Sequence, residues 1–473
     1  RAGLPVAGFA RGLSAAEDVA RWAHSHQPGS PADYPALIWI GSPAELRGAR
    51  LAADGATIRA DASTWAFDVV PRIALNRSYY NAASTAYFAG RTLKLRGSFA
   101  DGCWVARTLW PEDFRLGFDA APPSAAIAAA PEAIRALLRA DPRGGAQSAF
   151  SVTALWERSP GAAQRVEGKA VLAAMLNGAQ GDDDEAHGGH FAMVTGRVGE
   201  RGAIDDWLAS NFYALDVFSE KGIVAAVVPL DNYLTDLNSG QAWYRPSHLI
   251  VAVLSRDRAA GYVQSALNRV YNQFYRHQLV YGNVTMNCSG ISIDALRALG
   301  WPVRARGPTS RTLAWLGLPL IAARERDIGR TRQTFDYLCG DRTRVFPAAA
   351  FEETAASLLQ LAGGGRAPGT EFETALGDDI EALLWLRVPQ LPSSRAWGDF
   401  AVVSGGEYGA RLPADRSKAM IVPVPPRPFP AELRDPDLLP PAGSRSRLAA
   451  AAWTALLFAG IAWLAWRTVS PHL

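Results

Sequence analysis

A run of 19 uncharged residues near the end of the chain restricts what this protein can be more than any other feature. Residues 448–466 read LAAAAWTALLFAGIAWLAW, and at about 1.5 Å rise per residue such a helix is roughly 28 Å long, close to a bilayer core. Residues typical of a membrane interface flank the run or lie near its end, namely Arg445, Arg447, Trp463, Trp466 and Arg467. The pattern predicts one transmembrane helix, with a buried core helix as the alternative.

The rest of the chain divides by composition into four further segments. Residues 421–447 are crowded with proline, which blocks helical and central-strand hydrogen bonds and predicts a stiff, extended tether. Residues 1–165 mix alanine-rich helical stretches with β-rich runs and predict an N-terminal accessory α/β or β-rich domain. We expect the chemistry in residues 166–345, and an extension that packs on the body in residues 346–420.

The overall composition indicates a folded body that does not bind nucleic acid. Hydrophobic residues make up 49% and charged residues 20% of the 473 residues, which is enough to build a core. The 48 basic and 45 acidic residues are scattered and nearly balanced, so no basic stripe offers a phosphate-neutralising face. There is no GxSxG elbow, and no GK[ST] follows the glycines of residues 363–369. We therefore expect no serine α/β-hydrolase, no nucleotide site and no cofactor.

Two histidine groups are candidates for metal ligands, and we assign neither of them a metal. His24 and His26 have no carboxylate or cysteine nearby in the sequence and are typical of a solvated helix end. His187 follows the acidic run 182–185, which is typical of a solvated loop. The three cysteines form no CxxC pair, so a structural zinc site is also excluded.

One histidine and one cysteine are placed where chemistry is expected. His190 ends a polar loop and begins the apolar, strand-like segment FAMVTGRV. Cys288 precedes ISIDALRAL, a predicted helix that stops at Gly300 and Pro302. The free N–H groups and the positive dipole end of a helix N-terminus lower a thiol pKa and can hold an oxyanion. Cys288 is therefore a candidate nucleophile, and the alternative is a small buried hydrophobe.

These residues carry a resemblance to a known family. The GHF-type histidine, the following segment NFYALD (residues 211–216), predicted as a strand, and an aromatic-rich lead into NC at a helix start resemble the Lnb N-terminal periplasmic domain family. That family resembles the circularly permuted papain-like proteins, such as lecithin:retinol acyltransferase, in which histidine precedes cysteine. The resemblance covers roughly residues 168–345 and implies an α+β, permuted papain-like catalytic domain.

The resemblance also implies roles for individual residues. It makes Cys288 the nucleophile, His190 the general base, and Asn211 the third member that orients the imidazole through its amide oxygen. The carboxylates of three nearby residues remain alternatives to Asn211, namely Asp205, Asp206 and Asp216. Aromatic residues upstream of Cys288 are candidates for an acyl groove or for core packing, namely Tyr271, Phe274, Tyr275 and Tyr281.

Two enzymatic functions and one non-enzymatic function follow. The first is a membrane-anchored thiol acyltransferase that moves a fatty acyl group from phospholipid through a Cys288 thioester to an amine, such as a bacterial lipoprotein N-terminus. The second is an NlpC-type peptidoglycan peptidase or amidase, and the third is a membrane-tethered scaffold without chemistry. A long apolar tunnel ending at Cys288 is expected for the acyltransferase alone.

The expected location is the bacterial inner membrane with the body facing the periplasm, as the resemblance implies. The flanking charges lean the other way, since two arginines precede the run 448–466 and one follows it. In an oxidising periplasm, Cys103 and Cys339 are candidates for a disulfide that leaves Cys288 as the free thiol.

Overall fold

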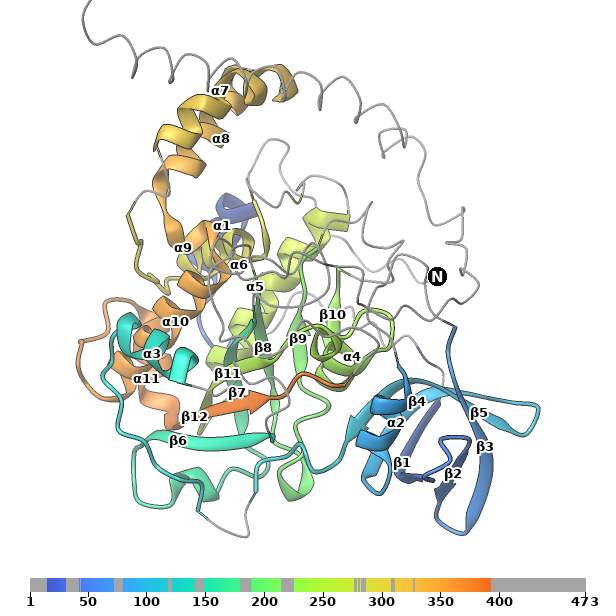
Figure 1. Ribbon diagram of the computed structural model, residues 1–473. Helices are drawn as coiled ribbons and strands as arrows, with labels where there is room; N and C mark the ends of the chain where they lie inside the picture. Colours follow the sequence, from blue (N-terminus) through green and yellow to red (C-terminus); the bar gives the residue numbers. More distant parts are fainter. Residues whose placement is uncertain are drawn as a thin grey trace, which may run out of the picture. The chain divides into compact units, whose positions relative to one another are not determined.

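Two β-sheets organise the part of the chain that the structure describes (Figure 1). The computed structural model describes residues 15–30, 42, 44–71, 80–117, 121–140, 149–178, 189–213, 225–275, 279, 281, 286–307, 311–325 and 328–392. Within these residues the protein has the predicted α+β class. The tether 421–447 and the run 448–466 lie outside them, and within the described ranges no helix has the length and apolar character to cross a membrane.

The smaller sheet is a closed five-stranded barrel in the order β1-β2-β3-β5-β4. Its strands are β1 (Ala44–Leu51), β2 (Thr57–Ala60), β3 (Ser63–Val69), β4 (Thr92–Ala100) and β5 (Cys103–Pro111), and the helix α2 (Ala82–Phe88) connects β3 to β4. The β4–β5 hairpin turns through Asp101 and Gly102, whose φ angles of 52° and 76° suit a two-residue type I′ turn. The barrel has the five-stranded Greek-key architecture of OB folds, an architecture that does not by itself assign a function.

The larger sheet has seven strands in the order β10-β9-β8-β7-β11-β12-β6, and its neighbours all pair antiparallel. The strands are β6 (Ser151–Glu157), β7 (Ala170–Asn177), β8 (His190–Arg197), β9 (Leu208–Ser210), β10 (Val227–Pro229), β11 (Ser247–Leu254) and β12 (Ile380–Val388). Every residue of β7 and β11 is buried, because both faces of the sheet are covered. This explains their continuous apolar runs, which replace the alternation of a half-exposed strand.

Alternate residues of each central strand belong to two different hydrophobic cores. Phe191 and Met193 of β8 face a core shared with helices, whereas Ala192 and Val194 face a core shared with the barrel. The helices that contribute to the first core are α1 (Ala15–Ser25), α3 (Pro131–Ala140), α5 (Arg258–Tyr275), α6 (Cys288–Ala298), α10 (Pro347–Ala362) and α11 (Glu371–Asp379). The remaining α-helices are α4 (Leu230–Thr235), α7 (Arg311–Glu325), α8 (Ile328–Gly340) and α9 (Arg342–Val345).

The larger sheet draws strands from three of the segments that the sequence predicts as separate units. β6 comes from the predicted accessory domain 1–165, and β12 comes from the predicted extension 346–420. β12 pairs with both β11 and β6, so the extension supplies an internal strand as well as helices that pack on the body. Composition does not reveal this arrangement, because strand pairing joins residues that are far apart in the sequence.

Candidate active site

Cys288 is the first residue of α6, as the sequence predicts. Asn287 precedes it as the N-cap, and its Oδ1 accepts hydrogen bonds from the backbone N–H groups of Ser289 and Gly290, both at 3.1 Å. Such a cap is worth about 1 kcal/mol and determines where the helix begins. The helix ends before Gly300, whose φ of 95° breaks the helical path. The Cys288 side chain is buried at the N-terminal end of this helix.

His190 opens β8 and is hydrogen-bonded to Asn211. The Nε2 atom of His190 lies 2.9 Å from Oδ1 of Asn211, and both residues are buried. The antiparallel pairing of β8 with β9 brings the two residues together, since Met193 lies opposite Ser210. Because the amide oxygen only accepts, the bond favours the tautomer with the proton on Nε2 and leaves the Nδ1 lone pair to act as a base.

Asn211 is positioned differently from the strand that the sequence predicts over residues 211–216. β9 ends at Ser210, so the prediction is wrong at its start, and residues 214–216 lie outside the described ranges. The backbone N–H of Asn211 donates to the carbonyl of Ala226 at 3.1 Å, which holds Asn211 beside β10. The Asn211 side chain is thereby directed to the histidine from the end of a short strand.

The structure brings Cys288 and His190 to the same end of β8. The sulfur of Cys288 accepts a hydrogen bond from the backbone N–H of Phe191, the residue directly after His190. It also accepts one from the hydroxyl of Tyr281, whose oxygen in turn accepts from the Cys288 N–H. Among the contacts of the described residues, no hydrogen bond joins the sulfur directly to the imidazole. Catalytic hydrogen bonds are often formed only when substrate is bound.

The candidate nucleophile and the candidate base are both electrically neutral in this site. Burial and the charge of Arg245 lower the pKa of His190 to about 3. The hydrogen bond that the ring makes to Asn211 acts in the opposite direction, to raise the pKa. Burial raises the pKa of the Cys288 thiol, although the hydrogen bonds from Phe191 and the neighbouring hydroxyls oppose that shift. Cys288 is therefore a neutral thiol and His190 a neutral imidazole in this structure.

Aromatic and polar side chains surround the imidazole. The ring of Tyr213 stacks on His190 with centroids 4.6 Å apart, and the ring of Tyr281 stacks on Tyr213 at 6.1 Å. Buried Arg245 donates to the hydroxyl of Tyr213 at 3.3 Å. The Tyr233 hydroxyl donates to Oδ1 of Asn177 at 2.5 Å. Arg245, Tyr233 and Asn177 are not marked by any sequence motif, because they come from separate segments that meet only in the fold.

The other aromatic residues named from the sequence pack in different surroundings. Tyr271 stacks on Phe212 at 4.2 Å, and its hydroxyl donates to the carbonyl of Ala226 at 3.2 Å. Phe274 is buried in the same core, whereas Tyr275 is partly exposed and donates to the carbonyl of Ala225 at 2.7 Å. Of the four residues considered for an acyl groove, Tyr281 is the one that contacts Cys288.

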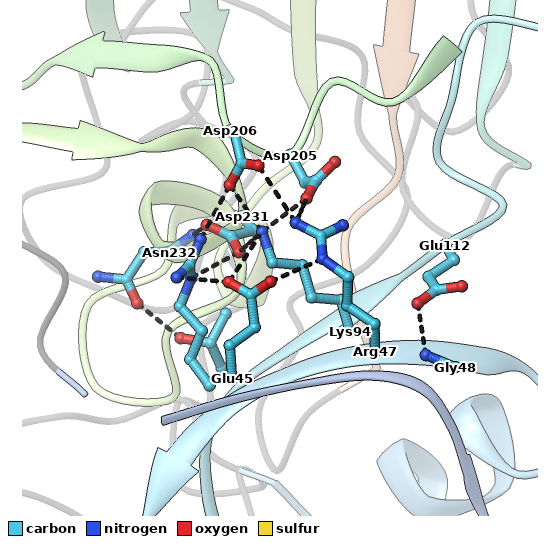
Figure 2. Close-up of polar contacts among 11 residues, drawn as sticks. Glu45, Arg47, Gly48, Lys94, Glu112, Asp205, Asp206, Asp231 and Asn232 are labelled. Atoms are coloured by element: carbon cyan, nitrogen blue, oxygen red, sulfur yellow. Dashed lines mark hydrogen bonds and ion pairs between the residues drawn. The ribbon is translucent and has the colours of Figure 1, made fainter. Parts of the chain in front are cut away.

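Two of the three carboxylates considered as alternatives to Asn211 belong to a different site. Asp205 and Asp206 lie in a group of charged side chains between β1, β4, the loop before β9, and α4 (Figure 2). We call this group the ion cluster, and its members are Glu45, Arg47, Lys94, Arg96, Asp205, Asp206 and Asp231. The third alternative, Asp216, lies outside the described residues.

The ion cluster has a lysine at its centre. Nζ of Lys94 lies 2.6 Å from Asp205, 2.8 Å from Asp206 and 2.9 Å from Asp231, and Lys94 is fully buried. Burial acts to lower the pKa of Lys94, but the carboxylates of Asp231 and Asp205 outweigh it and raise the pKa. The three aspartates are close enough together to hold a cation. The ammonium group of Lys94 already supplies that positive charge.

Of the other histidines and cysteines named from the sequence, the structure shows contacts for His26 and free thiols for Cys103 and Cys339. His26 stacks on Trp22 at 4.9 Å, and its Nδ1 lies 2.9 Å from the Trp22 carbonyl oxygen, so the helix end accounts for its contacts. His187 and residues 182–185 lie outside the described ranges. Cys103 and Cys339 are both free thiols, so the disulfide considered from the sequence is not formed.

Comparison with known proteins does not extend this assignment. No family model matches the chain, and no match was found among curated proteins or solved structures. The structure therefore shows an α+β protein with a buried cysteine, histidine and asparagine at one end of β8. The functional argument rests on the geometry of these three residues.

Proposed function

We propose that this chain is a cysteine-dependent acyltransferase with a circularly permuted papain-like catalytic fold, similar to the Lnb N-terminal periplasmic domain family. One observation carries the proposal. His190, bonded through Nε2 to Asn211, opens β8, and the next residue along the strand donates its N–H to the sulfur of Cys288. A nucleophile, a base and a residue that orients the base therefore meet at one strand end.

The first half-reaction loads an acyl group onto the enzyme. The Nδ1 atom of His190 takes the proton of the Cys288 thiol, and the sulfur attacks the ester carbonyl of a phospholipid. The oxyanion of the tetrahedral intermediate takes the place of the Tyr281 oxygen at the Cys288 N–H, the contact that Tyr281 makes in the structure. The carbon–oxygen bond then breaks, His190 returns its proton to the departing alkoxide, and a thioester and a lysophospholipid remain.

The second half-reaction transfers the acyl group to an amine. The amine attacks the thioester carbonyl, His190 takes a proton from the nitrogen, and the carbon–sulfur bond breaks. The thiolate recovers that proton, so the enzyme returns to its neutral resting state. A dry site protects the thioester from hydrolysis, and the burial of both Cys288 and His190 suits this need.

The proposed substrates and location follow from the resemblance and from the run 448–466. A bilayer-anchored body brings an enzyme to a phospholipid donor and to the N-terminus of a bacterial lipoprotein, both of which are held in the membrane. We place the protein in the bacterial inner membrane with its body facing the periplasm.

Intact-mass spectrometry of the full chain incubated with bacterial phospholipid tests the proposal. We expect a fatty-acyl mass increase that hydroxylamine removes, present in wild type and in Cys103→Ala and Cys339→Ala. It is expected to be absent from Cys288→Ala and strongly reduced in His190→Ala. Cleavage of cell-wall peptides without an acyl adduct would instead show a peptidase, and the absence of both activities would favour the scaffold.

A further inference from the structure

The helical hairpin formed by α7 and α8 exposes large apolar side chains. Trp315, Leu316 and Ile328 are 62%, 66% and 91% exposed. In the part of the chain that the structure describes, these are half of the six large hydrophobic residues that are exposed. Single exposed hydrophobic residues are ordinary, but several on one element mark a contact surface.

The two helices of the hairpin pack on each other. The ring of Trp315 on α7 meets Phe335 on α8 edge to face, with centroids 4.9 Å apart. Figure 1 shows α7 and α8 side by side, away from the strands of the larger sheet. The hairpin therefore buries part of its own apolar surface, and Trp315, Leu316 and Ile328 stay exposed to a partner.

The sequence of the hairpin matches a bilayer surface. Residues 313–323 read LAWLGLPLIAA, an uncharged run of 11 residues whose length is too short to span a bilayer and is compatible with an interfacial segment. Tryptophan favours the membrane interface. Exposed Arg311 and Arg332 flank the apolar residues and suit anionic headgroups; Arg332 also lies 3.7 Å from Asp336 in an exposed ion pair. The uncharged run 448–466 in the same chain, which the sequence predicts as a transmembrane helix, would hold the body near a membrane.

Both ends of the hairpin connect to the helix that carries Cys288. α7 follows α6 in the chain, and α8 leads into α9, which ends at Val345. The carbonyl of Val345 accepts a hydrogen bond at 2.8 Å from Nδ2 of Asn287, the residue that caps α6 directly before Cys288. The hairpin therefore lies in the chain between α6, which carries Cys288, and Val345, which bonds to the N-cap of that helix.

We propose that the α7–α8 hairpin docks on an anionic bilayer surface through Trp315, Leu316 and Ile328. The docking itself does not require acyl transfer. Its role in bringing Cys288 to a lipid donor rests on the proposed function. The occupant of this surface is lipid, rather than a second copy of the chain or another of its own segments.

Depth-dependent fluorescence quenching in the full chain tests the docking. A small environment-sensitive fluorescent amino acid replaces Leu316 in one chain and Phe99 in a matched chain, since Phe99 is an exposed apolar residue (52%) on the barrel. Both chains carry Cys288→Ala, so that no acyl adduct contributes to the signal. They are reconstituted into vesicles of phosphatidylethanolamine and phosphatidylglycerol, with or without brominated acyl chains.

We expect brominated lipid to quench the probe at position 316 and to leave the probe at position 99 unchanged. Trp315→Asp is expected to remove the quenching at 316, and Arg332→Glu to weaken it. Equal quenching at both positions, or none at 316, would overturn the docking. A blue shift of the probe at position 316 without lipid would also overturn the docking on lipid. If that shift depends on protein concentration, the occupant is a second copy of the chain. If it does not, the occupant is another segment of the same chain. An acyl adduct without quenching leaves the proposed function standing, and quenching without an adduct in wild type leaves the docking standing.

Discussion

The protein contains two groups of buried polar side chains that differ in their protonation states. At the start of β8, His190 and Cys288 are buried with both side chains neutral, because burial lowers the pKa of the histidine and raises that of the thiol. In the ion cluster, Lys94 is equally buried and remains charged, because three aspartates lie within 2.9 Å of its ammonium group. The same burial produces different protonation states because the nearest charges differ.

The difference separates the ion cluster from the pair of residues to which we assign catalysis. The ion cluster joins β1 and β4 of the barrel to α4 and the loop before β9, and every charge in it has an opposite charge nearby. His190 has Arg245 as the nearest charge that affects its pKa, and this charge opposes protonation. A neutral base beside a neutral thiol can accept a proton during a reaction, whereas a compensated ion pair holds its protons in place.

Replacing Lys94 with methionine is expected to have the largest effect on stability. The substitution leaves Asp205 and Asp231 buried with less positive charge nearby, which costs about 3–5 kcal/mol for a broken buried ion pair. Urea unfolding of the full chain measures this loss. Lys94→Met combined with Asp205→Asn is expected to recover part of it. A loss below about 1 kcal/mol would contradict the view that Lys94, Asp205 and Asp231 form a buried, mutually compensated group within the cluster.

Replacing Asn211 with alanine is expected to slow acyl transfer without removing the nucleophile. The His190 ring loses the acceptor for its Nε2 proton, so its tautomer and orientation are no longer held. We expect the rate of thioester formation to fall about 100-fold, equal to about 2.7 kcal/mol. Asn272→Ala on α5, which removes a hydrogen bond to Asn268, is the matched control. An unchanged rate in Asn211→Ala would remove Asn211 from the proposed site.

The neutral state of His190 predicts a dependence of stability on pH. Its folded pKa of about 3 lies below the ordinary value, so between pH 6.5 and about 3 the unfolded chain binds a proton that the folded chain excludes. The contribution of His190 is present above pH 6.5 and is lost as the pH falls, by up to about 1.4 kcal/mol per pH unit. Unfolding of wild type and His190→Gln across this range measures the difference. Parallel curves would show that His190 does not cause the slope.

The smallest effect is expected at Lys169, the second ion-paired lysine among the described residues. Lys169 pairs with Glu381 where both side chains are partly exposed, at 29% and 25%. Lys169→Met is therefore expected to cost at most about 1 kcal/mol, and less at high salt. It is also the matched control for Lys94→Met, because the same substitution is made in a wetter setting. A loss as large as that of Lys94→Met would end the contrast between the two lysines.

Local patterns predict the parts of the site that depend on neighbouring residues. Asn287 before a run with apolar residues at helical spacing marks the start of α6, so the local pattern alone places Cys288 at a helix N-terminus. The apolar segment after His190 likewise predicts β8. The strand predicted over residues 211–216 is wrong at its start, because contacts of Asn211 with His190 and Ala226 form beyond the end of β9.

Contacts between distant residues are not visible in local patterns. Lys94 and Asp205 are 111 residues apart, and neither has a motif that indicates the other. The same applies to Arg245 beside Tyr213, and to β12, which pairs with β6 across more than 200 residues. Asp205 and Asp206 are close to His190 along the chain, which makes them candidates for its partner, but the fold directs them to Lys94.

Helix starts and the spacing of apolar residues follow from the amino-acid order, because they depend on bonds and caps within a few residues. Protonation states, strand order and the partner of each buried charge follow from the folded arrangement. They depend on which groups exclude water from one another, and that is decided by packing between segments that the chain brings together from far apart.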